Sequence, residues 1–184
     1  MRHVQDLNNR DIGLSILGRA VHRRDVFGLA VLAALGLSVT DAGRQLVDAA
    51  AEEANTEGAS GSGRKVVHVA QRYEGARYKW GGASPKGFDC SGFTWYVYQK
   101  ATDMDIGRDV EEQWHHGHSV AHGKWQPGDL VFFKNTFERG LSHVGIFTRK
   151  DEFIHAENEK TGVVTSSLES DYYSKHYAGA RRLL

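Results

Sequence analysis

The stretch that decides the fold of this 184-residue sequence is Gly87-Phe88-Asp89-Cys90-Ser91-Gly92-Phe93, which holds the only cysteine. It lies where a glycine-rich turn gives way to an apolar, aromatic run, so helical spacing is expected from Ser91 to about Ala101. Cys90 would then lie at the first turn of a helix, where the positive end of the peptide dipoles favours the thiolate, the nucleophilic form of cysteine. The alternative is a small buried hydrophobic residue, which is the common role of a lone cysteine.

Composition excludes several classes of protein. The chain has 23 basic and 23 acidic residues, a balance that indicates neither a nucleic-acid-binding protein nor a polybasic membrane patch. A single cysteine rules out an intrachain disulfide framework and cannot build a thiolate zinc site alone. The length fits one domain with a tail.

The N-terminal part of the chain is typical of an export signal and leader. An apolar run at 26–39 is too short to span a bilayer comfortably but fits the apolar region of a signal. The pair Arg23-Arg24 just before it resembles a twin-arginine signal, and small residues at 49–51 offer a cleavage site. The alternative is a buried core helix. We expect residues 1–51 to direct export to the periplasm or the outside of the cell, without a stable membrane anchor.

Residues 52–65 contain several glycines and serines, a composition typical of a flexible linker. From Val66 the apolar spacing tightens and predicts a helix that ends near Gly75. A further short helix is expected over 109–116. The predicted folded domain therefore covers residues 66–184.

The last third of the chain changes to the spacing of β-strands. Short apolar segments alternate with short polar connections, which suits antiparallel hairpins. Helices first and strands after argue for an α+β domain, with helices packed on a sheet of about five strands. The expected strands are Asp129–Phe133, His143–Thr148, Glu152–Ala156, Gly162–Thr165 and Ala178–Leu183.

Two histidines fall where a base for the thiol is needed. If the strands that carry them form a hairpin with a turn at 149–151, pairing about a centre near residue 149 sets His143 opposite His155. Cross-strand neighbours on one face are about 5 Å apart, close enough for one imidazole to hold the other. Cys90 at its helix start would then face His143, with His155 behind. The alternative for each histidine is an ordinary half-buried strand residue.

Four other histidines lie close together between the predicted helices and strands. Two of them, His118 and His122, have the i,i+4 spacing of metal ligands on a helix, but Gly117 and Gly123 break the region, so no metal site is predicted. A polar loop near the substrate groove is the preferred interpretation. The four histidines are His115, His116, His118 and His122.

The segment Trp80-Gly81-Gly82 allows two interpretations. It is either a plain glycine turn or a place where the backbone comes close to Cys90 or to a bound peptide. In the second case Tyr78 would place a phenol near the thiol.

Several segments, in their order along the sequence, resemble segments of the NlpC-type cell-wall peptidases, and together they extend over roughly residues 66–183. The departures are small: Lys79 and Phe93 are variants, and Trp114-His115-His116 is unusual, which affects subsite preference rather than the catalytic set. The matching segments are Tyr78–Gly82, Gly87–Phe93, Arg108 with Gln113, Gln126–Phe133, Ser142–Ile146, Phe153–Ala156 and Ala178–Arg182.

The resemblance implies a papain-like cysteine peptidase fold and an enzyme that cleaves peptidoglycan stem peptides, many members of the family acting between γ-D-glutamate and a diamino acid. It implies Cys90 as nucleophile, His143 as base and His155 as the polar residue that orients the base. Tyr78 matches a tyrosine beside the thiol. Asp89 and Ser91 match a pair that helps to hold the substrate amine in members preferring a free stem N-terminus. We expect the enzyme to need no cofactor and to act as a monomer.

Overall fold

The structure is a computed structural model that describes residues 61–184. The predicted export signal and leader, 1–51, and residues 52–60 of the predicted linker lie outside the described residues. The described part falls within one compact unit, residues 55–184. None of its helices combines the length and the apolar character needed to cross a bilayer.

The first described segment is a helix that covers residues 61–71. The prediction of a flexible linker was therefore wrong for residues 61–65. Within this helix Gly63 lies directly against the backbone of Pro127, because a Cβ there would collide with the Pro127 carbonyl. Glycine thus lets the helix pack closely on the loop that leads into the sheet.

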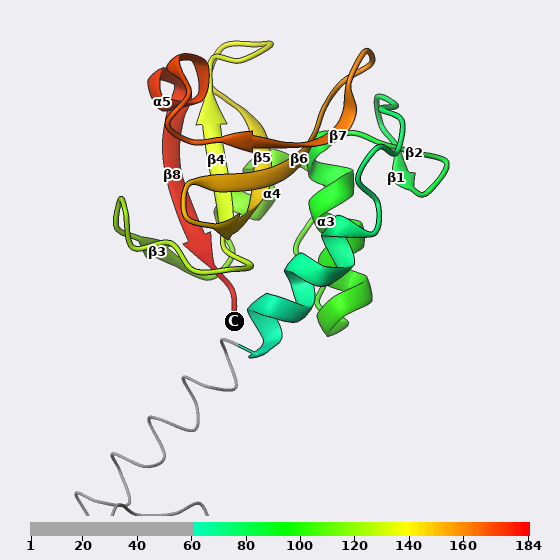
Figure 1. The fold of residues 1–184 in the computed structure, drawn as a ribbon, viewed down its shortest axis with the longest axis horizontal. Helices are drawn as coiled ribbons and strands as arrows, with labels where there is room; N and C mark the ends of the chain where they lie inside the picture. The colour runs from blue at the N-terminus through cyan, green and yellow to red at the C-terminus, as the bar shows by residue number, and fades with distance from the viewer. Residues whose placement is uncertain (1–60) are drawn as a thin grey trace, which may run out of the picture. The chain divides into compact units, whose positions relative to one another are not determined.

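The main sheet has six antiparallel strands in the order β3-β8-β4-β5-β6-β7 (Figure 1). All five predicted strands are present. The sixth, β3, was missed because its short and mostly exposed sequence has no apolar run, and it forms only by pairing with β8. The strands are β3 (His118–Val120), β4 (Leu130–Lys134), β5 (Leu141–Arg149), β6 (Glu152–Asn158), β7 (Gly162–Ser167) and β8 (Tyr177–Arg182).

Three further helices and one small hairpin complete the fold. Figure 1 shows α3 beside the sheet and α5 near the end of β4. The α+β class predicted from the sequence is thus confirmed. The elements are β1 (Ala83–Ser84), β2 (Gly87–Phe88), α3 (Cys90–Thr102), α4 (Val110–Trp114) and α5 (Asp171–His176).

Strand β4 is buried on both faces, as its continuous apolar sequence predicts. Leu130 and Phe132 join a core cluster with Phe93 of α3, whereas Val131 and Phe133 belong to a second cluster on the other side. Full burial of a side chain such as Phe93 stabilises the fold by about 2 kcal/mol. The first cluster fixes α3, and with it Cys90, against the sheet.

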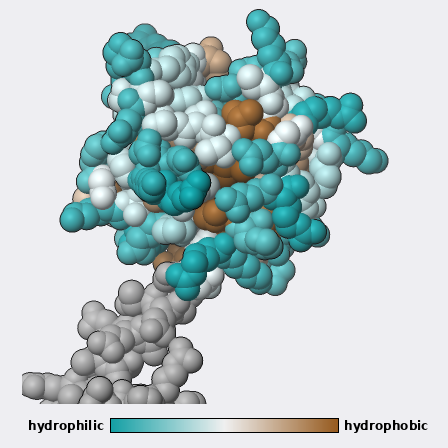
Figure 2. Space-filling model, viewed as in Figure 1, coloured by the Kyte–Doolittle hydropathy of each residue, from teal (hydrophilic) through white to brown (hydrophobic). Residues whose placement is uncertain are grey.

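The surface is largely hydrophilic on the face shown in Figure 2, with hydrophobic residues exposed in small areas near its middle. Among residues 61–184, the large hydrophobic side chains with the most exposed surface are Trp80 (68%), Phe137 (51%) and Tyr172 (48%). The rings of Trp80 and Phe137 touch edge to face, with 5.5 Å between their centroids. The two rings therefore form a small exposed aromatic pair contributed by two loops.

Candidate active site

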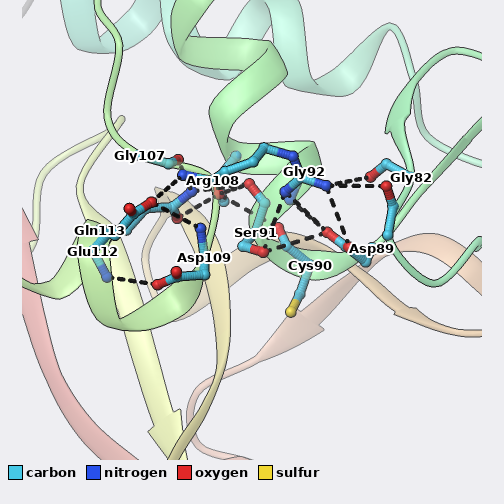
Figure 3. Close-up of polar contacts among 12 residues, drawn as sticks. Gly82, Asp89, Cys90, Ser91, Gly92, Gly107, Arg108, Asp109, Glu112 and Gln113 are labelled. Carbon is cyan, nitrogen blue, oxygen red and sulfur yellow. Dashed lines mark hydrogen bonds and ion pairs between the residues drawn. The ribbon is translucent and has the colours of Figure 1, made fainter.

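Cys90 is the first residue of α3 and has only 4% of its surface exposed. The preceding residue, Asp89, caps the helix, because its carboxylate accepts a 2.6 Å hydrogen bond from the amide of Gly92. This cap fixes the direction in which the helix starts, and therefore the direction of the thiol. In Figure 3 the sulfur points away from the polar network around Asp89 and Arg108.

The two predicted histidines meet. His143 on β5 and His155 on β6 are both buried, and 2.7 Å separates Nε2 of His143 from Nδ1 of His155. The predicted register was wrong, however. The strands pair Ile146 with Ile154, which sets Gly145 opposite His155, so the imidazoles meet as diagonal neighbours.

Gly145 makes the diagonal contact possible. A Cβ at this position would lie 2.6 Å from Cδ2 of Phe153 and 3.0 Å from Cβ of His155. Any larger residue would push the His155 ring away from its partner. Sequence reasoning missed this role, because glycine inside a strand marks a close approach without naming the group that approaches.

Cys90 lies against β5 next to His143. The backbone amides of Ser91 and Val144 act on the thiol and lower its pKa, and Val144 directly follows His143 in the strand. Within residues 61–184, no hydrogen bond joins the thiol to either imidazole. The Nε2 atom of His143 is used by His155, which leaves Nδ1 as the ring nitrogen available to a thiol.

The resting site is uncharged. Burial, reinforced by the charge of Asp89, raises the pKa of the Cys90 thiol to about 12, while the amides of Ser91, Val144 and Cys90 act in the opposite direction. Burial lowers the pKa of His143 to about 4, and burial together with His143 lowers the pKa of His155. The amides at the helix start do favour the thiolate, but desolvation outweighs them, so the expectation of a resting thiolate was wrong.

Ser166 is a member of the site that sequence reasoning missed. Its Oγ lies 3.0 Å from Nε2 of His155, on the side opposite His143. The predicted strand ended at Thr165, whereas β7 continues to Ser167. The alternation along β7 would have revealed Ser166 had the strand been drawn to its full length.

Tyr78, which the resemblance sets beside the thiol, lies close to the start of α3. Its backbone forms a bridge to Phe88, just before the start of α3. Burial raises the pKa of the Tyr78 phenol to about 12, with further contributions from Cys90, Asp89 and Glu159. The phenol is therefore neutral and able to donate a hydrogen bond.

Asp89 and Ser91 are engaged with the protein itself. Oδ1 of Asp89 accepts the Gly92 amide, and the Ser91 hydroxyl donates to the same atom at 3.3 Å. The guanidinium of Arg108 lies 3.4 Å from Oδ2 of Asp89 and 3.5 Å from Oγ of Ser91, and it also donates to the carbonyl of Gly81 at 3.2 Å (Figure 3). This network ties the turn before the hairpin to the start of α3.

Gln113 supports the same helix turn from beneath. It is fully buried, its amide donates to the carbonyl of Ser91 at 2.9 Å, and its oxygen accepts from the hydroxyl of Thr94 at 2.7 Å. Arg108 and Gln113 were noted in the sequence only as matching residues. The structure gives both a position against the first turn of α3.

Two of the four clustered histidines, His118 and His122, do not lie beside the candidate site. His118 begins β3, the edge strand of the sheet, and β8 and β4 separate it from His143 on β5. For these two residues the expectation of a polar loop near the substrate groove was therefore wrong. His122 packs on Trp125 and Tyr177, and among residues 61–184 no three metal-binding side chains come together.

The chain is similar in sequence to known proteins. The chain is 42% identical over 118 residues to the gamma-DL-glutamyl hydrolase of Bacillus subtilis. The aligned region makes up 64% of this chain and 28% of that relative. It is 35% identical over 113 residues to the murein DD-endopeptidase MepH of Escherichia coli, covering 60% of this chain and 42% of the relative. The chain thus spans less than half the length of either protein.

A solved structure agrees with these relatives. The NlpC/p60 domain of the peptidoglycan hydrolase SagA superposes with a TM-score of 0.58 at 34% identity, covering 65% of this chain and 97% of that domain, which confirms the predicted papain-like α+β fold. The sequence model of the NlpC/P60 family matches residues 75–182, the region that holds the helix start and both histidine strands. The chain therefore belongs to the NlpC/P60 family.

Proposed function

We propose that this chain is a secreted cysteine endopeptidase that hydrolyses peptidoglycan stem peptides. The observation that carries the proposal is the 2.7 Å contact between His143 and His155, next to the strand position that meets Cys90. Cysteine catalysis requires a nucleophile, a base and a group that orients the base. The relatives named as a glutamyl hydrolase and a murein endopeptidase support the substrate class.

The proposed mechanism starts from a neutral pair. The sulfur of Cys90 attacks the scissile carbonyl while Nδ1 of His143 takes the thiol proton. Because burial raises the pKa of the thiol and lowers that of the imidazole, proton transfer accompanies the attack rather than preceding it. Backbone amides at the start of α3, including that of Cys90, stabilise the oxyanion.

The second half of the reaction restores the enzyme. His143 gives its proton to the leaving amine, and the acyl group remains on Cys90 as a thioester. Water then attacks the thioester with His143 as base, which releases the acid and regenerates the thiol. His155 holds the ring of His143 in one orientation throughout, and Tyr78, Asp89 and Ser91 are the proposed contacts for the substrate.

We propose the bond between γ-D-glutamate and the diamino acid as the one that is cleaved. The similarity to a gamma-DL-glutamyl hydrolase supports this choice. The second candidate is the DD bond of the peptide cross-link, which the similarity to a murein DD-endopeptidase favours. The products differ in mass, because the first bond lies within one stem and the second joins two stems.

The proposal also covers the organisation of the chain. Residues 1–51 serve as the export signal and leader, and residues 66–184 form the catalytic domain. The enzyme acts in the periplasm or outside the cell as a monomer, binding stem peptides and neither nucleic acid nor a cofactor. The competing proposals are a non-catalytic wall-binding module on the same fold and an amidase of another substrate.

The test is digestion of purified peptidoglycan followed by mass spectrometry of the released fragments. The wild-type chain is expected to release fragments cut at the γ-D-glutamyl bond, and Cys90→Ala to release none. The variant His176→Gln is the matched control, because His176 lies on α5 and bonds only the carbonyl of Lys134 at the surface. Equal fragment release by wild type and Cys90→Ala would exclude the mechanism, and binding without release by both would favour the module.

A further inference from the structure

Hydrogen bonds continue behind the two histidines. Nε2 of His155 contacts Oγ of Ser166 at 3.0 Å. The Ser166 hydroxyl in turn lies close enough to the Tyr173 phenol to act on its pKa, which it lowers. The Tyr173 hydroxyl donates to Oε1 of Glu157 at 3.0 Å. The chain of contacts therefore runs from the base to a carboxylate through side chains from β6, β7 and α5.

The environment keeps this chain of contacts in one arrangement. Tyr173 has only 7% of its surface exposed, and its ring packs edge to face on His155 at 5.3 Å between centroids. At its outer end Glu157 is held a second time, because Oε2 accepts a 2.6 Å hydrogen bond from the hydroxyl of Thr161. Burial, with Glu157 next, raises the pKa of Tyr173, so its phenol keeps the proton that it donates.

The carboxylate decides the direction of every hydrogen bond in the chain. A carboxylate can only accept, so the Tyr173 phenol donates to Glu157 and is left to accept from the Ser166 hydroxyl. Oγ of Ser166 then accepts from Nε2–H of His155. Nδ1 of His155 in turn accepts from Nε2–H of His143.

The result is a defined tautomer at the base. With Nε2 of His143 carrying the proton, Nδ1 holds the free electron pair that a base needs. If every hydrogen bond in this series ran in the opposite direction, Nδ1 of His143 would carry the proton, and His143 could not accept the proton of the thiol. In a neutral imidazole the group bonded to one nitrogen determines the role of the other.

We propose that Ser166, Tyr173 and Glu157 are positioning residues that fix the tautomers of His155 and His143 and so keep Nδ1 of His143 ready to act as base. Glu157 also places a negative charge at the end of the chain, which stabilises the imidazolium that forms on His143 during attack. No net proton movement through the chain is required. The inference rests on the proposed function only in giving His143 the role of base.

Kinetics with Tyr173→Phe give the first test. This variant keeps the packed ring and removes only the hydroxyl, so kcat is expected to fall on the order of ten-fold with KM unchanged, because a misassigned tautomer weakens general base catalysis. Tyr172→Phe is the matched control: it lies next to Tyr173 on α5, and its hydroxyl bonds only the carbonyl of Thr136. The double variant Ser166→Ala/Tyr173→Phe is expected to be no slower than the worse single variant, since either change cuts the same chain.

The second test reads the tautomers directly and needs no substrate. In ¹⁵N-histidine NMR spectra of the full chain at neutral pH, His143 and His155 are expected to carry the proton on Nε2 in the wild type and Tyr172→Phe. Tyr173→Phe and Glu157→Gln are expected to shift both toward mixed tautomers. Unchanged tautomers together with an unchanged kcat in Tyr173→Phe would overturn the proposal, as would a loss of activity with wild-type tautomers, which would mark a packing role. Changed tautomers in a chain that cleaves no stem peptide would support the positioning role and count against the proposed function alone.

Discussion

Nε2 of His143 and Nδ1 of His155 lie 2.7 Å apart although the two residues are diagonal neighbours on β5 and β6. Their contact depends on Gly145, which lies opposite His155 and has no side chain to fill the space. The orientation of the candidate base is therefore set by strand register and by a residue that carries no functional group.

Gly145→Ala tests this dependence on space. The new methyl group would lie 2.6 Å from Phe153, so the His155 ring must shift and kcat is expected to fall about ten-fold or more, with a stability loss of about 1–3 kcal/mol from overpacking. The control is Gly61→Ala, which has no atom within 4 Å of the added Cβ and lies in a helix, where alanine is favoured. Steady-state kinetics and urea denaturation measure both effects. A Gly145→Ala enzyme with wild-type kcat would show that the histidine contact is not needed.

Stability is expected to fall in mild acid because of the buried histidines. His143 binds a proton near pH 6.5 when the chain is unfolded and only at about pH 4 when folded. The contribution of neutral His143 to the free energy of unfolding is therefore complete above pH 6.5. It is lost as the pH falls from 6.5 to 4, and the total loss is about 3 kcal/mol. Urea denaturation at pH 7 and pH 4.5 measures the loss. His143→Gln is expected to reduce the pH dependence, and an unreduced dependence would assign it to other groups.

Arg108→Gln is expected to slow alkylation of Cys90 by iodoacetamide about three-fold at pH 8. Without the guanidinium, the charge of Asp89 is no longer offset and raises the pKa of the Cys90 thiol further, which lowers the fraction of thiolate. The greater nucleophilicity of the remaining thiolate restores part of the lost alkylation rate. The single cysteine makes the labelling unambiguous. Arg149→Gln is the control, because Arg149 forms an exposed ion pair with Glu152.

The background Asp89→Asn separates charge from packing in this experiment. Asparagine keeps the helix cap and removes the charge. Arg108→Gln is expected to have no effect on alkylation in that background. If Arg108→Gln still slowed alkylation three-fold in the Asp89→Asn background, the role of Arg108 would be only to hold the backbone of the Gly81 turn in place.

Phe137→Ala is expected to raise KM about three-fold while kcat stays unchanged. Phe137 and Trp80 touch at 5.5 Å from two anchored loops, one adjoining Tyr78 and the other held by bonds of Thr136 to Ser142 beside His143. An exposed aromatic pair there offers a binding surface worth about 0.5–1.5 kcal/mol. Phe137→Leu, which keeps an apolar side chain, is expected to lie between wild type and alanine. An unchanged KM in both variants would remove the pair from the substrate site.

Local patterns predicted most of the fold. The apolar run after Cys90 and the five short apolar segments depend on spacing along the chain, and the structure contains each of them. β3 was missed because it exists only by pairing with β8, and residues 61–65 were taken as linker because their composition does not reveal the contact of Gly63 with Pro127.

The candidate site was predictable in identity and less so in geometry. Cys90, His143 and His155 follow from ordered motifs, but a register error of two residues moved the histidines to opposite positions. Ser166 lay one residue past the predicted strand end, and the link from Ser166 to Tyr173 joins β7 to a helix packed on the sheet. Contacts of this kind depend on tertiary packing, which no short window of sequence contains.

The most direct test of the central claim is intact-mass analysis of the enzyme during a single turnover of a synthetic stem peptide. The wild-type chain is expected to gain transiently the mass of the acyl fragment that ends in γ-D-glutamate, on Cys90, and then to return to its free mass as product forms. Cys90→Ala is expected to show neither the adduct nor the product. Product formation by Cys90→Ala at the wild-type rate would contradict the account.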